Sequence, residues 1–198
     1  MKEERPPSCK REAAGARVVS AARIPDDEGA LRLALADAAG QSELILLSGG
    51  SSVGVRDAAA SAVAALGTLL FHGLSVKPGK PTLCGDIGGV PVLGRPGHPV
   101  AAYFICRLLA VPLLVGMLGT RGEEVTREAV LTAAIPSNHG REEYVPVRLT
   151  DAGEAAPIMG KSGLITTLSQ ANGYIRIPRD TEGLMRGARV TVFRFDGI

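Results

Sequence analysis

Residues 43–47 read Glu43-Leu44-Ile45-Leu46-Leu47, and they are followed by Ser48-Gly49-Gly50-Ser51-Ser52-Val53-Gly54. The continuous apolar run is typical of a strand buried on both faces, and the small residues after it break the strand sharply. An alanine-rich helix is predicted from Asp57 to Leu66, with Gly67 as its stop. The order of strand, glycine-rich turn and helix indicates an α/β unit.

Strands and helices alternate along the first two thirds of the chain, on both sides of this unit. The further predicted elements are a strand over residues 16–21, a helix from Asp26 and Asp27 to Gly40, a strand over 69–76, a hairpin around Gly88-Gly89 and a long helix after Pro99. This alternation predicts a parallel sheet of the α/β class.

Beyond Gly119 the helical periodicity disappears and short runs of period two replace it. Val145, Val147 and Leu149, for example, alternate with a proline and an arginine. Several short strands at close spacing predict a small all-β barrel or sandwich. We therefore expect an α/β domain over residues 1–120 and a C-terminal β domain over residues 121–198.

The composition excludes several classes of protein. The 22 Lys and Arg nearly balance the 20 Asp and Glu, so the basic surplus of a general nucleic-acid binder is absent. The apolar run from Pro99 to Leu118 contains Arg107 and Pro112, which favours a buried core helix over a membrane span. Three widely spaced cysteines without a C-x-x-C pair and the lack of an apolar leader indicate a cytoplasmic protein.

The loop from Ser48 to Gly54 is a candidate anion site. Consecutive small residues let backbone N–H groups converge, and the helix that follows adds its positive end. The loop matches neither a Walker motif nor a G-x-G-x-x-G turn, and a ligand-free turn of this composition is as common. Asp57, at the start of the helix, could bind Mg²⁺ or cap the helix, and Asp26 and Asp27 pose the same alternatives at the preceding helix.

Two proline-stiffened turns carry further candidate residues. Lys77-Pro78-Gly79-Lys80-Pro81 holds two ammonium groups on a rigid turn, which suits a multiply charged anion, although solvated lysines are the simpler alternative. Arg95-Pro96-Gly97-His98-Pro99 leads into the long helix, and His98 could bond a ligand or cap the turn. The three scattered histidines have no metal-ligand spacing.

Taken in order, these motifs resemble the molybdopterin molybdenumtransferases, the MoeA family that includes the E domain of gephyrin. The resemblance covers nearly the whole chain from about residue 13. It rests on Ile24-Pro25-Asp26-Asp27, Leu47 to Gly54 with Asp57, Lys77 to Pro81, Gly94 to Val100, Lys161-Ser162-Gly163 and Ala171-Asn172-Gly173.

The resemblance implies a fold and an activity. The fold is a molybdopterin-binding, MogA-like doubly wound sheet that lacks its first strand, followed by a small C-terminal all-β barrel. The activity is insertion of molybdate into adenylylated molybdopterin with release of AMP in the presence of Mg²⁺. The catalytic residues implied are Asp57, Asp26 and Asp27, with Asp57 and Asp27 as metal ligands. The implied pterin-binding residues are Ser48, Gly49, Gly50, Ser51, Ser52, Gly54, Lys77, Gly79, Lys80, Pro96, Gly97, His98 and Pro99.

The sequence differs from the family pattern at one turn residue and in its domain content. His98 stands where the family usually has Asn, which replaces an amide by a titratable ring. Family members also carry two N-terminal domains and a first α/β strand before the point where this sequence starts. We expect a homodimer. Two other functions remain as alternatives to the transferase. One is a non-catalytic molybdopterin-binding or scaffold fragment that needs a separate N-terminal half, and the other is an unrelated anion or nucleotide module.

Overall fold

The computed structural model of the protein describes residues 15–49, 53–158 and 165–196. The chain divides into two compact units, one formed by residues 1–74 and 79–98 and the other by residues 75–78 and 99–198. The helix after Pro99 therefore groups with the β-rich part of the chain, whereas the domains predicted from the sequence divide at residue 120.

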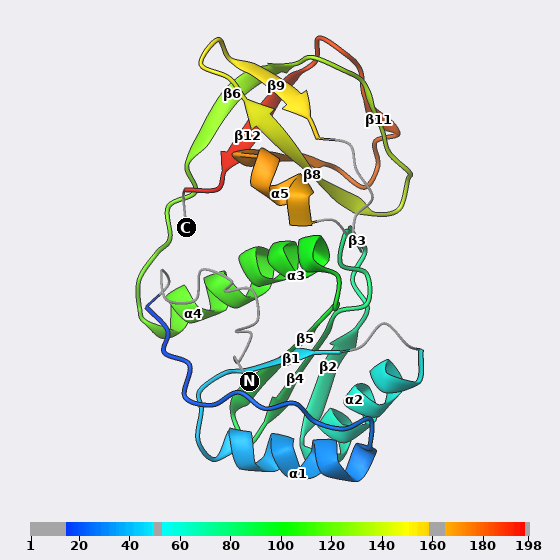
Figure 1. The fold of residues 1–198 in the computed structure, drawn as a ribbon, viewed down its shortest axis with the longest axis vertical. Coiled ribbons are helices and arrows are strands. Elements are labelled where there is room, and N and C mark those ends of the chain that lie inside the picture. Colours follow the sequence, from blue (N-terminus) through cyan, green and yellow to red (C-terminus); the bar gives the residue numbers. More distant parts are fainter. Residues whose placement is uncertain (1–14, 50–52, 159–164, 197–198) are drawn as a thin grey trace. The chain divides into compact units, whose positions relative to one another are not determined.

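The first unit is an α/β layer built on a four-stranded sheet (Figure 1). Its elements are α1 (Glu28–Ala39), β1 (Ile45–Ser48), α2 (Val53–Leu66), β2 (Thr68–His72), β4 (Leu83–Ile87) and β5 (Val90–Arg95). The strand order is β1-β5-β4-β2, in which β1 and β5 are parallel and β4 is antiparallel to both of its neighbours. The predicted α/β class is confirmed. The sheet is mixed because the predicted hairpin around Gly88-Gly89, where both glycines have positive φ, reverses the chain between β4 and β5.

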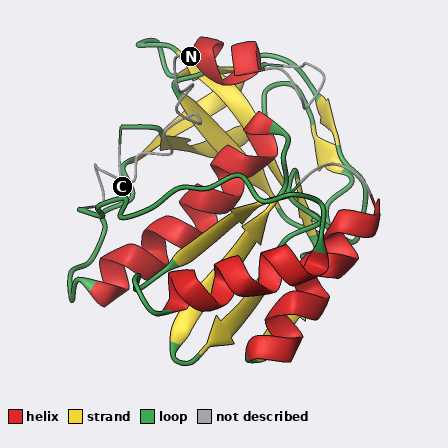
Figure 2. Ribbon diagram, turned by 60° about the horizontal axis from the view of Figure 1, so that its bottom comes forward, coloured by secondary structure: helices red, strands yellow, loops and turns green. Residues whose placement is uncertain are grey.

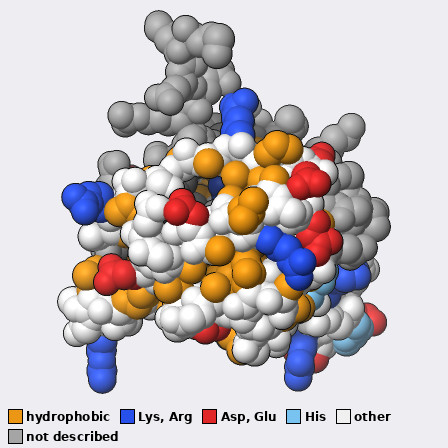
Figure 3. All heavy atoms as spheres, turned by 90° about the horizontal axis from the view of Figure 1, so that it is seen from below, with side chains coloured by type: hydrophobic (Ala, Val, Ile, Leu, Met, Phe, Trp, Pro, Cys, Tyr) orange, Lys and Arg blue, Asp and Glu red, His pale blue; other side chains and the backbone are white. Residues whose placement is uncertain are grey.

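Helices α1 and α2 pack together and cover one face of this sheet (Figure 2). Leu35 of α1 and Val63 of α2 are buried against Ile45 of β1 and Val92 of β5. Gly85 allows the close approach of α2, because a Cβ there would lie 2.3 Å from Cγ1 of Val63 and 2.7 Å from a backbone oxygen. Seen from the end where α1 lies (Figure 3), hydrophobic side chains also reach the surface, and Leu33 of α1 is 76% exposed.

The strand predicted over residues 16–21 does not form. This segment has no strand assignment, and Val18 and Val19 are each 53% exposed. β-branched residues favour a strand only where a neighbouring strand accepts the backbone hydrogen bonds and buries one face. In the described part of the chain, β1 pairs with β5 and no strand pairs with residues 16–21, so the prediction was wrong for want of a partner.

The second unit contains a closed five-stranded barrel (Figure 1). Its strands are β6 (Thr126–Leu131), β8 (Glu142–Leu149), β9 (Glu154–Pro157), β10 (Gly173–Ile177) and β12 (Arg189–Arg194), and β10 closes the barrel by pairing with β8. The remaining elements of this unit are β3 (Val76–Lys77), β7 (Ile135–Pro136), α5 (Ile165–Gln170) and β11 (Gly183–Leu184). Val145, Val147 and Leu149 fill the barrel interior, as their alternation predicts. The barrel alternative of the sequence analysis is thus confirmed.

An aromatic cluster joins the long helix to the outside of the barrel. Phe104 of α3 (Pro99–Ile105) packs edge-on against Tyr174 of β10, with ring centroids 5.3 Å apart, and also contacts Tyr144 of β8. Arg107 lies over the Tyr174 ring and donates a hydrogen bond to the carbonyl oxygen of Arg194. The outward face of these strands is therefore buried, which explains why β8 shows little exposed alternation.

The long helix contains a π-helical turn at Cys106–Ala110, between α3 and α4 (Val111–Met117). Pro112 has no N–H to donate to the preceding turn, and the Val111 N–H reaches back to the carbonyl of Cys106. Within the described residues, Pro99–Met117 is the one helix with the length and apolar composition of a membrane span. Core helices of soluble proteins share those properties, and α3 buries its side chains in this way.

Replacing Gly85 by Ala should destabilise the first unit. The added methyl group would collide with α2 and with the backbone of β2, so we expect the free energy of unfolding to fall by about 2 kcal/mol in urea titrations. Gly116→Ala in α4 is the matched control, because its Cβ meets no atom within 4 Å. It should be neutral or stabilising by about 0.5 to 1 kcal/mol, and equal losses in both variants would contradict the packing argument.

Candidate functional site

Parallel pairing brings two of the predicted loops to one edge of the first unit's sheet. Ser48, the last residue of β1, is the register partner of Arg95, the last residue of β5. Because parallel strands end at the same edge, the loops that follow them start side by side. A Cβ added to Gly97 would lie 2.9 Å from the carbonyl oxygen of Gly49, so the two loops are in backbone contact.

The backbone at Gly49 faces open space. A Cβ built there meets no atom within 4 Å. This combination of a bare backbone, room beside it and the start of α2 a few residues later suits the close approach of a phosphate. Gly50, Ser51 and Ser52 lie outside the described residues, so the convergence of the loop amides remains a prediction. Gly54 lies in the first turn of α2.

The predicted acidic residues have separate structural settings. Asp27 caps α1, since its Oδ1 accepts a hydrogen bond from the Ala30 N–H at 2.7 Å. Asp26 is exposed next to it. Asp57 lies in α2, and the structure describes only its backbone. Over residues 15–49, 53–158 and 165–196, no group of three or more His, Cys, Asp or Glu is arranged to hold a metal ion.

The turn that carries Lys77 and Lys80 is fixed by buried hydrogen bonds. The hydroxyl of Thr82, which is fully buried, donates to the carbonyl oxygen of Gly79 at 2.7 Å, and the Leu74 N–H donates to the carbonyl of Lys80 at 2.9 Å. Gly79 has a φ of +127°, a conformation that disfavours other residues. Lys80 is exposed. Thr82 was not singled out by the sequence reasoning, because a threonine next to Pro81 carries no distinctive local signal.

Lys77 has a carboxylate partner that the sequence did not predict. Its Nζ lies 2.7 Å from Oε1 of Glu143, at the start of β8. Lys77 belongs to the second unit and Lys80 to the first, so the structure does not define the two ammonium groups as one site. No motif could have revealed Glu143, because the strand pairing that brings it to Lys77 joins distant parts of the chain.

The turn from Arg95 to Pro99 contains Gly97, the residue that contacts Gly49. Pro96 is buried, and Gly97 and His98 are exposed. Pro99 begins α3, as expected for a proline at the first position of a helix. His98 is exposed at the edge of the first unit, and its two predicted roles, bonding a ligand or capping the turn, stay predictions.

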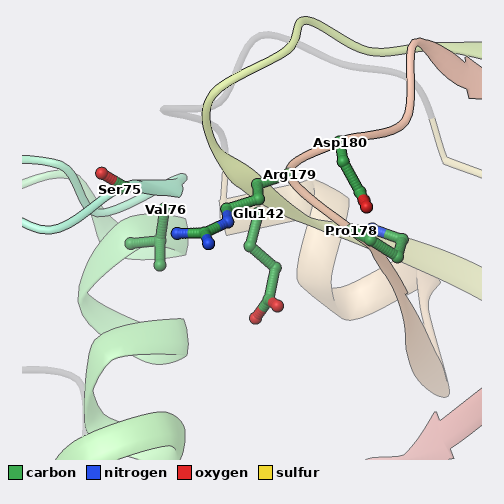
Figure 4. A pocket seen from close by; sticks show the side chains of 6 residues that line it. All are labelled: Ser75, Val76, Glu142, Pro178, Arg179 and Asp180. Carbon is green, nitrogen blue, oxygen red and sulfur yellow. The ribbon is translucent and has the colours of Figure 1, made fainter.

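A second cluster of ionisable groups lies on the barrel beside β3. The Tyr144 hydroxyl donates to Oε1 of Glu142, whose Oε2 is 3.6 Å from Nε of Arg176. Burial raises the pKa of the Tyr144 phenol above its usual range, and the hydrogen bond to Glu142 raises that pKa further. A pocket of about 440 Å³ adjoins this cluster (Figure 4). It is lined by Ser75, Val76, Glu142, Pro178, Arg179 and Asp180.

Asn172, which the sequence analysis marked as part of a motif, has a structural role. Its side-chain oxygen accepts a hydrogen bond from the Leu149 N–H at 2.7 Å, and its side-chain nitrogen donates to the Leu149 carbonyl at 2.8 Å. The carboxamide thereby replaces one residue of a strand ladder at the end of β8. Gly173 next to it leaves room for β12, because a Cβ would lie 2.7 Å from Cγ1 of Val192.

Family models match both parts of the chain. Residues 8–116 match the model described as a probable molybdopterin binding domain, and residues 128–195 match the MoeA C-terminal region, domain IV. The chain belongs to the MoeA family. It covers a C-terminal portion of that family's sequence, and membership associates it with molybdenum cofactor biosynthesis.

Individual relatives agree with this assignment. The chain is 31% identical to molybdopterin molybdenumtransferase 2 of Mycobacterium tuberculosis, over 91% of this chain and 47% of that protein. It is 28% identical to the molybdopterin molybdenumtransferase of Bacillus subtilis, over 90% of this chain and 43% of that protein. A MoeA structure from Pyrococcus horikoshii superposes with a TM-score of 0.75 at 34% identity, covering 88% of this chain and 43% of that one. The MoeA-family chain thus spans about half the length of these relatives.

Replacing Gly97 by Ala should destabilise the loop contact. The methyl group would press on the Gly49 carbonyl, and we expect a loss of about 1 kcal/mol in the free energy of unfolding. Gly49→Ala is the matched control, because the space beside Gly49 is open. Thermal or urea unfolding that gives the same loss for both variants would show that the two loops are not in contact.

Proposed function

We propose that this chain provides the pterin-phosphate site for the insertion of molybdate into adenylylated molybdopterin, a reaction that releases AMP. The observation that carries the proposal is the meeting of Gly49 and Gly97 at the carboxyl ends of β1 and β5. Ligands of open α/β sheets bind at such an edge, where loops from neighbouring parallel strands adjoin. The named molybdopterin molybdenumtransferases among the relatives supply the substrate class.

The glycine-rich loop would anchor the phosphate through its backbone. The residues assigned to it are Ser48, Gly49, Gly50, Ser51, Ser52 and Gly54. Peptide N–H groups at the start of α2 bind an anion without a counter-charge, because the helix dipole and the unpaired N–H groups act in the same direction. The open space at Gly49 supports this role, since a side chain there would keep a ligand away from the backbone.

The two lysines would stabilise charge as AMP leaves. Cleavage of the phosphoanhydride of the adenylylated substrate leaves negative charge on the departing phosphate, and a positioned ammonium group stabilises that charge most when it is already in place. Lys80 is exposed on a turn that Thr82 holds from beneath, and Lys77 carries a positive charge next to Glu143. Gly79, Pro96, His98 and Pro99 complete the proposed set as turn residues.

The magnesium site stays a prediction. Asp27 uses a carboxylate oxygen to cap α1, and the described part of the chain has no group of three or more His, Cys, Asp or Glu that could hold a metal ion. Asp57 remains the carboxylate predicted to bind Mg²⁺, together with Asp26 or Asp27. We also expect a homodimer, as the resemblance implies, and a cytoplasmic location, as the cysteine pattern indicates.

Gly49→Ala tests the phosphate loop directly. Because the space beside Gly49 is open, the variant should fold with unchanged stability, yet its methyl group would occupy the space proposed for the ligand. Titration with molybdopterin, followed by pterin fluorescence, should show binding weakened by about tenfold or more, or about 1.4 kcal/mol. Unchanged affinity in a folded Gly49→Ala protein would place the ligand elsewhere.

The runner-up function is a non-catalytic molybdopterin-binding or scaffold fragment that works with a separately supplied N-terminal half. The free edge of β1 favours it. Within the described residues, β1 is paired along one edge, and the β-type segment 16–21 remains exposed and unpaired. A strand inserted beside β1 would satisfy that edge and could bury Val18 and Val19.

Complementation separates the two candidates. The chain is mixed with the purified N-terminal half of the Pyrococcus horikoshii MoeA protein, and AMP release from adenylylated molybdopterin is measured alongside hydrogen exchange at β1. The fragment hypothesis predicts AMP release only in the mixture, with slower exchange of the β1 amides. AMP release by the chain alone, without change at β1 on mixing, would exclude it in favour of the enzyme.

A further inference from the structure

We propose that Glu143 is a positioning residue for Lys77, holding its ammonium group in a fixed orientation from which it can bind an anion. The inference rests on the proposed function, in which Lys77 is an anion ligand. Nothing in the motifs of the sequence points to Glu143, and the argument comes from strand register, burial and hydrogen bonding within the second unit.

Strand register fixes the two residues side by side. β3 pairs in parallel with the start of β8, so that Val76 is opposite Glu142 and Lys77 is opposite Glu143. The Glu142 N–H donates to the carbonyl oxygen of Ser75 at 2.9 Å, which secures the start of this pairing. Register partners in neighbouring strands project to the same face of a sheet. The register therefore places the lysine and the glutamate side by side.

The carboxylate of Glu143 is held at both oxygens. Oε1 lies 2.7 Å from Nζ of Lys77, and Oε2 accepts a hydrogen bond from the Ser137 hydroxyl at 2.8 Å. Glu143 is only 9% exposed. A buried carboxylate that lost its charged partner would be strongly destabilised, so this glutamate retains the lysine. Ser137 in turn prevents the carboxylate from rotating away.

Lys77 remains available to a ligand on its outer side. Its side chain is 50% exposed. An ammonium group has three N–H donors, and the contact with Glu143 uses one of them. A free lysine loses much rotational freedom when it binds a phosphate. Here the contact with Glu143 has already restricted the side chain, so less freedom is lost on binding. The negative charge of Glu143 reduces the net positive charge of the pair. Glu143 therefore favours anion binding by fixing the orientation of Lys77 and not by adding charge.

Two substitutions separate the effect of the length of the Glu143 side chain from the effect of its charge. Glu143→Gln keeps the length of the side chain and an oxygen that accepts from Nζ, but removes the charge. Glu143→Asp keeps the charge and shortens the side chain, so that its oxygens no longer reach Nζ at hydrogen-bond distance. Glu142→Gln is the matched control, because Glu142 precedes Glu143 on β8 and pairs with Arg176 instead. Lys77→Ala reports the contribution of the lysine itself.

The experiment measures two properties of each full-length variant. The first is the dissociation constant for molybdopterin, from pterin fluorescence. The second is the rate at which a water-soluble amine-reactive reagent modifies Lys77, read by mass spectrometry with Lys80 as the internal reference. Circular dichroism confirms that each variant is folded. The modification rate gives a ligand-free measure of how firmly Lys77 is held.

A positioning role predicts a distinct order of effects. Glu143→Asp should weaken molybdopterin binding by about tenfold and speed Lys77 modification, whereas Glu143→Gln should stay within about threefold of the unsubstituted chain. Glu142→Gln should change neither property. If Glu143→Asp does not fold, Ser137→Ala replaces it, because loss of that hydrogen bond frees the carboxylate to rotate and should weaken binding in the same direction.

Three results would overturn the inference, and they separate it from the proposed function. Binding that is lost in Lys77→Ala but kept in Glu143→Asp and Ser137→Ala would remove the role of Glu143 alone. Binding weakened by Glu143→Gln as much as by Glu143→Asp would assign the effect to charge. A chain that binds no molybdopterin before substitution would overturn the proposed function as well.

Discussion

The parallel ladder between β1 and β5 is the interaction on which the candidate site depends. Four residue pairs in register, from Ile45 with Val92 to Ser48 with Arg95, align the ends of the two strands. Because side chains alternate between faces, a shift of β1 by one residue would turn Ile45 away from the helices that bury it. Burial of these apolar residues thus enforces the alignment that brings Gly49 to Gly97.

In the second unit, helix α3 packs against the outside of the barrel. Phe104 packs against both Tyr144 and Tyr174, and Arg107 donates a hydrogen bond to the carbonyl oxygen of Arg194, the last residue of β12. Edge-to-face ring contacts add to the burial of apolar area, and the arginine pairs a polar group that the helix would otherwise cover. The first part of the predicted core helix, α3, is thus buried against the barrel, whereas α4 has no buried residue.

Features determined by neighbours in the chain could be predicted from the sequence, and features determined by distant pairing could not. The cap at Asp27, the end of α1 near Gly40 and the hairpin at Gly88-Gly89 follow from local residue preferences. The segment 16–21 has local strand preference but lacks a partner, so the preference alone did not produce a strand. The contact of Lys77 with Glu143 depends on the register of β3 against β8, which no local pattern records.

The position of β8 within its unit has a consequence for how the protein moves. β8 is paired with β10 along one edge and with β3 and β9 along the other, and its side chains are buried on both faces. Such a strand exposes its amides to solvent only when the whole unit opens, whereas β1, with four paired residues and one described neighbour, can open in a small local fluctuation. Glu143 is thus carried by a strand that is paired along both edges, and Lys77, on the two-residue strand β3, keeps its place only while its pairing with β8 lasts.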